Sequence, residues 1–171
     1  HSFPTRRSSD LFMDTTANVS VADSNTLTTV VDYQSPSVTL TSATANPTNG
    51  NIAVTATFSE NVTGFVVGDI TATNATVGSF AGSGSTYTFT VTPTIADGAS
   101  GTVAISIAGG VAQDTATNDN TASNTLSYTV DKIVPTVTLT SVTSNPTNGA
   151  IAVTATLSEI VTGFIVGDIT A

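Results

Sequence analysis

A 99-residue internal repeat constrains this chain more than any other feature of its sequence. Residues 32–72 realign onto residues 131–171 at an offset of 99, and 31 of the 41 aligned pairs are identical. Upstream, residues 14–32 resemble residues 114–131 with one residue inserted. A unit of this length is too long for a solenoid repeat, which spans about 20–50 residues. It suits self-contained β-sandwich domains, which run to about 100 residues.

The repeat divides the chain into four parts. Residues 1–11 resemble translated sequencing-adapter DNA; the alternative is the basic region of a signal peptide, but no apolar run follows them. They are left out of the fold prediction. Residues 12–31 are then the C-terminal tail of one repeat, residues 32–130 a complete repeat, and residues 131–171 the N-terminal part of the next. We therefore expect the chain to be a fragment of a longer tandem array.

Alternation of apolar residues with threonine predicts β-strands throughout the complete repeat. Period-two alternation bounded by Gly, Pro and Asn clusters is typical of strands with one buried and one exposed face. The strand candidates are carried by Val38 and Leu40; by Ile52, Val54, Ala56 and Phe58; by residues 65–67 with 69–72; by Val77 and Phe80; by Tyr87, Phe89 and Val91; by Val103, Ile105 and Ile107; and by Leu126, Tyr128 and Val130. Helical periodicity is absent. The fold prediction is all-β: tandem Ig-like antiparallel β-sandwich modules of about seven strands.

The composition argues against several classes of partner and site. Without residues 1–11, Lys132 is the only basic residue against 11 acidic ones, which gives a net charge of −10. Such a chain cannot neutralise phosphates, so neither nucleic acid nor an anionic membrane surface is an expected partner. The absence of Cys rules out disulfides, thiolate metal sites and thiol nucleophiles. No apolar stretch approaches the about 20 residues of a membrane span.

The repeats offer little material for catalysis. General acid–base catalysis needs a tunable His, Lys or Cys, or paired carboxylates in a pocket. Only carboxylates are available, and we expect them in loops at the ends of the sandwich. The segments Gly82-Ser83-Gly84 and Gly109-Gly110 lack the strand-to-helix context that a phosphate-binding loop needs. We predict that the chain is not an enzyme and has no catalytic residues.

The few carboxylates are expected to gather where neighbouring repeats meet. In a sandwich threaded from these strands, the loop with Glu60 and the approach to Asp69 lie at the N-terminal end of the module. The loop with Asp114 ends there too, and Asp32 is the linker residue that enters the same end. Asp97 alone belongs to the opposite end, in an Asp-Gly turn.

Converging carboxylates without a basic partner predict a site for Ca²⁺, which takes about six to eight oxygen ligands from carboxylates, Asn and backbone carbonyls. The predicted ligands at successive junctions are Asp32, Glu60, Asp69 and Asp114, with Asn118 as a further candidate, and then Asp131, Glu159 and Asp168. The ion would stiffen the array by tying each linker to the loops. The alternative is that these acids stabilise turns through local hydrogen bonds and keep a Thr-rich surface soluble. No Asp-x-Asp or EF-hand spacing decides between the two.

Several segments resemble the bacterial Ig-like domain family. They are residues 36–41 (PSVTLT), 58–60 (FSE), 62–65 (VTGF), 68–70 (GDI), 85–89 (STYTF), 112–114 (AQD) and 122–124 (ASN). The resemblance covers residues 14–171. It departs from the family at one point: where relatives often read Asp-x-Ala-Gly-Asn, this chain has Thr117 in place of the glycine. The resemblance implies tandem arrays in large secreted or surface-anchored bacterial proteins, many of them adhesin-like.

Three functions are compatible with these patterns. The first is a non-catalytic extracellular spacer whose partners are the neighbouring repeats of the same chain. The second is a binding module whose loops or threonine faces contact a cell-surface glycan, ice or a partner protein. The third is an accessory domain of a secreted hydrolase. The near-identity of successive repeats favours the spacer, because repeated spacers tolerate homogenisation whereas a receptor site usually lies in one divergent domain.

Overall fold

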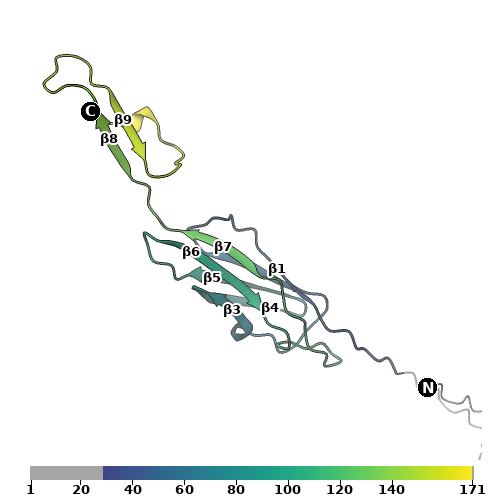
Figure 1. The fold of residues 1–171 in the computed structure, drawn as a ribbon. Helices are drawn as coiled ribbons and strands as arrows, with labels where there is room; N and C mark the ends of the chain where they lie inside the picture. The colour runs from purple at the N-terminus through teal and green to yellow at the C-terminus, as the bar shows by residue number, and fades with distance from the viewer. Residues whose placement is uncertain (1–28, 171) are drawn as a thin grey trace, which may run out of the picture. The chain divides into compact units, whose positions relative to one another are not determined.

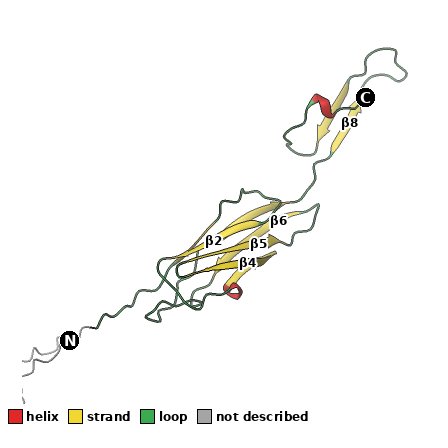
Figure 2. Ribbon diagram, turned by 180° about the vertical axis from the view of Figure 1, so that it is seen from behind, coloured by secondary structure: helices red, strands yellow, loops and turns green. Residues whose placement is uncertain are grey.

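The computed structural model describes residues 29–170 of the chain. The predictions for residues 1–11, the translated adapter, and for nearly all of residues 12–31, the tail of a preceding repeat, lie outside the described residues. Residues 32–131 form a β-sandwich of seven strands in two antiparallel sheets (Figures 1 and 2). Within residues 29–170, no helix has the length and apolar character needed to cross a membrane.

The two sheets divide the strands in the manner of an Ig-like sandwich. The first has the order β1-β2-β5-β4 and the second the order β3-β6-β7. The strand bounds in the first sheet are β1 Val38–Thr41, β2 Ile52–Phe58, β4 Ala75–Ser83 and β5 Thr86–Pro93. Those in the second are β3 Ile70–Thr73, β6 Ser100–Ile107 and β7 Leu126–Asp131. The all-β prediction is confirmed.

The predicted alternation places the core between the sheets. In β2, Ile52, Val54, Ala56 and Phe58 are all buried, while Ala53 and Thr57 between them are exposed. The same pattern holds in β5 and β6, where Val91 and Ile105 are fully buried. Burial of each such aliphatic side chain stabilises the fold by roughly 1.5–3 kcal/mol, which is how a module without a disulfide holds together.

A cluster of aromatic side chains stabilises the N-terminal end of the module, where the chain enters it. Phe58, Phe65, Phe80 and Tyr87 form pairs whose ring centroids lie 5.0 to 5.9 Å apart, mostly edge to face. Such pairs contribute about 0.5–1.5 kcal/mol beyond the area that they bury. Because Phe58 and Phe65 flank the loop that contains Glu60, their packing anchors that loop at both ends.

The third predicted strand is wrong in its first half. Residues 65–67 do not form a strand, and a single 3-10 turn, η1 (Val67–Asp69), precedes β3. The carboxylate of Asp69 accepts a hydrogen bond from the backbone N–H of Val66 at 2.8 Å. This local bond stabilises the turn and competes with strand pairing, which is why the apolar residues at 65–67 do not extend β3.

The next repeat contributes a two-stranded sheet of β8 (Val137–Ser141) and β9 (Val153–Leu157), followed by η2 (Val166–Asp168). These elements correspond to β1, β2 and η1, and Val137 pairs with Leu157 as Val38 pairs with Phe58. Leu139 is 66% exposed, whereas its counterpart Leu40 is 2% exposed. The difference arises because residues 131–170 contain no counterparts of β6 and β7, which belong to the sheet that faces β1 across the core of the complete repeat.

Candidate functional site

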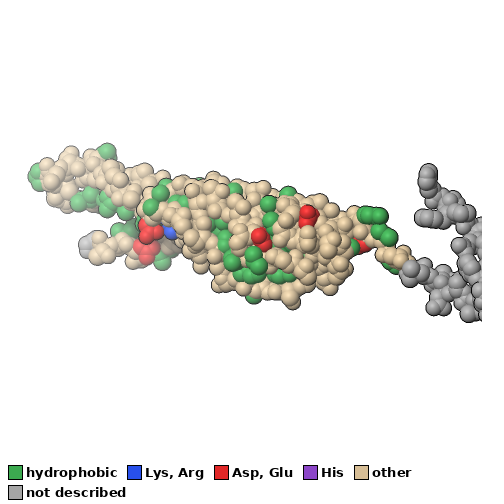
Figure 3. Space-filling model, turned by 90° about the horizontal axis from the view of Figure 1, so that it is seen from below, with side chains coloured by type: hydrophobic (Ala, Val, Ile, Leu, Met, Phe, Trp, Pro, Cys, Tyr) green, Lys and Arg blue, Asp and Glu red, His purple; other side chains and the backbone are tan. Residues whose placement is uncertain are grey.

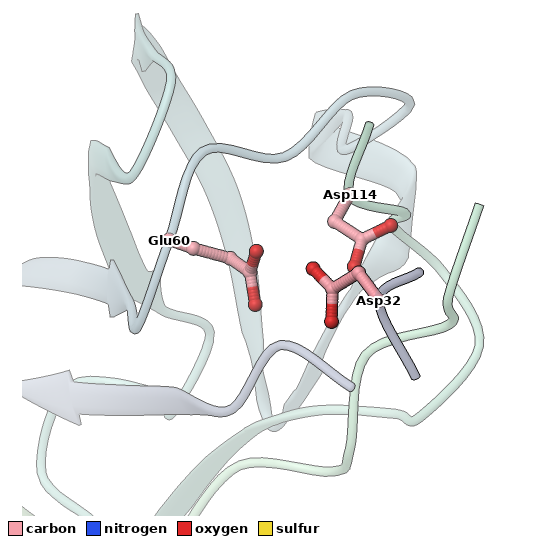
Figure 4. A group of neighbouring side chains, drawn as sticks. All are labelled: Asp32, Glu60 and Asp114. Atoms are coloured by element: carbon pink, nitrogen blue, oxygen red, sulfur yellow. The ribbon is translucent and has the colours of Figure 1, made fainter. Parts of the chain in front are cut away.

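Three carboxylates from separate segments converge at the N-terminal end of the module. Asp32 lies in the linker, Glu60 in the loop after β2, and Asp114 in the loop between β6 and β7. One oxygen of each lies within 4.8 Å of one oxygen of each of the others. Figure 4 shows the three side chains directed toward a shared space. The topology brings them together because β1 begins, and β2 and β6 end, at this end of the sandwich.

Asp32 ties the linker to the module. Its Oδ1 accepts a hydrogen bond from the backbone N–H of Gln34 at 2.9 Å, and its carbonyl oxygen accepts one from Nδ2 of Asn118 at 3.2 Å. Asp131 forms the same local turn, in which its Oδ1 accepts from the N–H of Ile133 at 3.0 Å. The aspartate that opens each linker therefore has a turn-forming role, as the alternative interpretation of the sequence expects.

Asp114 is buried, with 3% of its surface exposed, and its loop is folded around its carboxylate. Oδ1 accepts hydrogen bonds from the backbone N–H groups of Ala116 and Asn118, and Oδ2 accepts one from Nδ2 of Asn118. Thr117 within the loop adopts a positive φ of 68°. Burial by itself raises the pKa of Asp114, but the hydrogen bonds from Asn118, Ala116 and Thr117 outweigh it, so the pKa lies below its ordinary value.

A backbone bridge joins the loop that carries Glu60 to the loop that carries Asp114. Thr63 N donates to the carbonyl of Gln113 at 2.7 Å, and Gln113 N donates to the carbonyl of Thr63 at 3.0 Å. Oδ1 of Asp119 accepts from Nε2 of Gln113 at 2.8 Å. These backbone bonds hold the two loops side by side. They therefore keep Glu60 and Asp114 close together without a direct hydrogen bond between the two carboxylates.

The site has a negative electrostatic potential. Partial burial raises the pKa of Glu60, and the negative charges of Asp114 and Asp32 raise it further. Lys132, the only basic residue among those the structure describes, lies at the opposite end, where its Nζ is 3.7 Å from Oδ1 of Asp97. Three carboxylates that face one another without a basic partner match the hard oxygen donors that Ca²⁺ prefers.

The other predicted ligands are not part of this group of three carboxylates. Asp69 is at the same end of the module, but it is not part of the group of three, and its carboxylate caps η1. Asp168 caps η2 in the same way, with Oδ2 accepting from the N–H of Ile165 at 3.0 Å. Asp131 and Glu159 are the counterparts of Asp32 and Glu60, and residues 131–170 contain no counterpart of Asp114. Asn118 contacts the group through its amide nitrogen, as a donor.

Asn120 supports the site and was missed by the sequence prediction. It is 3% exposed, and its Oδ1 accepts from the backbone N–H groups of Val111 and Ala112 at 2.9 and 2.8 Å. Its Nδ2 donates to the carbonyls of Ala108 and Thr121. One amide thus fixes both ends of the loop that presents Asp114. No sequence signal distinguishes Asn120 from the exposed Asn and Thr residues around it.

Comparison with known proteins identifies one relationship. A model of the family described as "Bacterial Ig-like domain" matches residues 32–130, which is the complete repeat predicted from the sequence. No curated protein and no solved structure matches the chain. The matched region contains Asp32, Glu60 and Asp114 together with all but the last residue of β7.

Proposed function

The chain belongs to the bacterial Ig-like domain family, and on this premise we propose that its modules are non-catalytic spacers in a surface-exposed or secreted bacterial protein. Domains of this family are structural or adhesive modules, generally non-catalytic and typical of extracellular and surface proteins. The partners of each module are the neighbouring modules of the same chain. The near-identity of the two repeats supports this function. Spacer modules can remain nearly identical, whereas a receptor site usually lies in one divergent domain.

The surface of the module supports the same function. Its outward strand positions are mostly threonine: Thr39 pairs with Thr57, and Thr55 with Thr88, across the first sheet. The face seen in Figure 3 is largely uncharged, with acidic side chains in a few isolated places. A hydroxyl-covered flank of this kind remains hydrated and presents few charged groups for a partner to recognise.

We further propose that Asp32, Glu60 and Asp114 bind one Ca²⁺ ion at the junction. The observation that carries this proposal is the approach of three carboxylates from three segments to within 4.8 Å of one another. Backbone carbonyls and water would complete the coordination shell. Asp131 and Glu159 would act in the same way at the next junction. Asp69 and Asp168 are left out, because their carboxylates cap η1 and η2.

The mechanism is restriction of the linker. Asp32 precedes β1 by a short exposed segment, whereas Glu60 and Asp114 belong to loops fixed by the aromatic cluster and by Asn120. An ion shared by the three residues would hold the linker against the module and limit its swing. It would also neutralise the repulsion from Asp114 and Asp32 that, in addition to burial, raises the pKa of Glu60.

Calorimetric titration of the chelator-treated chain with CaCl₂ tests the site. We expect binding with a dissociation constant of about 10⁻⁴–10⁻³ M, as in other extracellular modules. At a free Ca²⁺ concentration about 100 times the dissociation constant, the free energy of unfolding should rise by about 2.7 kcal/mol. Backbone ¹⁵N relaxation should show reduced motion at Tyr33 and Gln34.

Two variants make the titration specific. Glu60→Gln should weaken binding strongly, whereas Asp97→Asn, at the opposite end beside Lys132, should leave it unchanged. If the unaltered chain gives neither heat nor a thermal shift at millimolar Ca²⁺, the cation proposal is wrong and turn formation accounts for these acids. The spacer assignment would then rest on the family and the repeat alone.

A further inference from the structure

The first and last segments of the module lie side by side, although neither sheet pairs β1 with β7. Residues 36–48 and residues 121–131 run in the same direction, and Thr48 forms a parallel bridge with Val130. We call these two segments the seam. Its backbone hydrogen bonds are Thr121 N to Pro36 O at 2.8 Å, Thr48 N to Thr129 O at 3.0 Å and Asp131 N to Thr48 O at 2.9 Å.

Between these backbone bonds, side chains take the place of strand pairing. Asn124 accepts from Leu40 N at 2.8 Å and donates to Leu40 O at 3.1 Å. Asn46 donates to Ser127 O at 3.1 Å and accepts from Thr129 N at 2.9 Å. An Asn amide can do this because it presents a donor and an acceptor, as a peptide group does. The hydroxyl of Tyr128 adds a bond to Thr44 O at 3.2 Å.

The direction of the seam determines how it responds to tension. A spacer is loaded between its ends, so force enters at Asp32 and leaves near Asp131. The parallel segments are then pulled in opposite directions along their own lengths. The bonds of the seam then share the load, because they are pulled in shear. The other hydrogen bonds of β1 join it to β2, which does not connect β1 to the exit of the chain.

We propose that the seam is the mechanical clamp of the module, meaning the set of bonds that must break before the module unfolds under tension. Asn46 and Asn124 form the side-chain bonds of this clamp. The inference rests on the proposed spacer function only in assuming that load runs from one end to the other; it does not depend on Ca²⁺. In the next repeat, Asn145 and Thr147 stand at the positions of Asn46 and Thr48. The clamp is therefore built from residues that recur along the array.

Single-molecule pulling of the full chain in chelator tests the clamp by changing only the direction of force. The chain has no Cys, so handles can be attached through introduced cysteines. Gln34→Cys with Ile133→Cys loads the seam in shear. Asn49→Cys with Ile133→Cys places both handles at one end of the seam and opens the same bonds one after another. At equal force we expect unfolding to be at least about tenfold slower in shear. Equal rates in the two geometries would overturn the proposal.

A second measurement compares two asparagines in the shear geometry. Asn46→Ala removes two seam bonds and should speed unfolding under load by about tenfold. Asn120→Ala removes four bonds, none of which joins the two segments of the seam, and should lower equilibrium stability at least as much, yet speed loaded unfolding less. The opposite ranking contradicts a clamp. Failure of Ca²⁺ binding would leave both measurements unchanged, so the two proposals fail separately.

Discussion

The side-chain amide of Asn124 pairs with both the N–H and the carbonyl of Leu40, 84 positions earlier in the chain. It occupies the edge of β1 at which another strand would otherwise add. Unpaired strand edges are templates for edge-to-edge association. Closing them matters especially in a tandem array, where near-identical modules are held at high local concentration.

Removing the Asn124 amide should destabilise the module. Asn124→Ala leaves the N–H and carbonyl of the buried Leu40 without their partner, which costs about 1–3 kcal/mol. The exposed Asn51 on the approach to β2 is the matched control, and Asn51→Ala should change stability by no more than about 0.5 kcal/mol. Urea unfolding measures both variants, and equal effects would contradict the role of Asn124 at the edge.

Glu60 and Asp114 should affect stability with opposite signs. The pKa of Glu60 is raised in the folded state. Its contribution to the free energy of unfolding is therefore fully present at pH values below its pKa in the unfolded chain, and is lost as the pH rises through its folded-state pKa. Glu60→Gln should therefore stabilise the metal-free module at neutral pH. The pKa of Asp114 is lowered in the folded state. Its contribution to the free energy of unfolding is therefore present at pH values above its pKa in the unfolded chain, and is lost as the pH falls through its folded-state pKa. Asp114→Asn should destabilise at neutral pH.

The measurement for this pair is the free energy of unfolding in chelator between about pH 3 and pH 8. Asp97→Asn is the control, because this exposed carboxylate lies beside Lys132 at the other end. Stabilisation by Asp114→Asn, or destabilisation by Glu60→Gln, would show that the hydrogen bonds and repulsions described here do not dominate the site.

Replacing Thr117 with glycine should stabilise the module. The φ of 68° at Thr117 is unfavourable for a β-branched residue by about 1–2 kcal/mol, part of which is offset by the greater chain entropy of glycine when unfolded. Thr117→Gly should therefore stabilise the module by up to about 1 kcal/mol. Thr115→Gly, in the same exposed loop without a positive φ, should destabilise by about 0.5–1 kcal/mol. Thermal unfolding distinguishes the two, and a loss of stability in both would refute the strain at Thr117.

Asn120 should link stability to cation binding. Asn120→Ala frees the loop that presents Asp114, so it should lower stability by about 2 kcal/mol or more and also weaken Ca²⁺ binding. Asn124→Ala should lower stability while leaving the affinity for Ca²⁺ unchanged. Calorimetry on both variants under folding conditions checks this. If the two lose affinity equally, the loop does not position Asp114.

The sequence predicted the sandwich because strand alternation is a local signal. Each apolar residue of β2 and β5 is two positions from the next, and antiparallel succession then fixes which loops share an end. This was enough to place Glu60 and Asp114 together and Asp97 apart from them. The prediction was wrong at residues 65–67, where the bond from Val66 N to Asp69 replaces strand pairing.

The sequence alone therefore determined the repeat, the fold class and the end of the module that carries each loop, because all three follow from short periodicities counted along the chain. Only the tertiary structure decided which side chains meet. Asp32 and Asp114 approach while Asp69 turns to its own backbone, and Asn46, Asn120 and Asn124 replace missing backbone partners. A hydrogen bond depends on position and direction within fractions of an ångström, and residues some 80 positions apart leave no periodic trace of it.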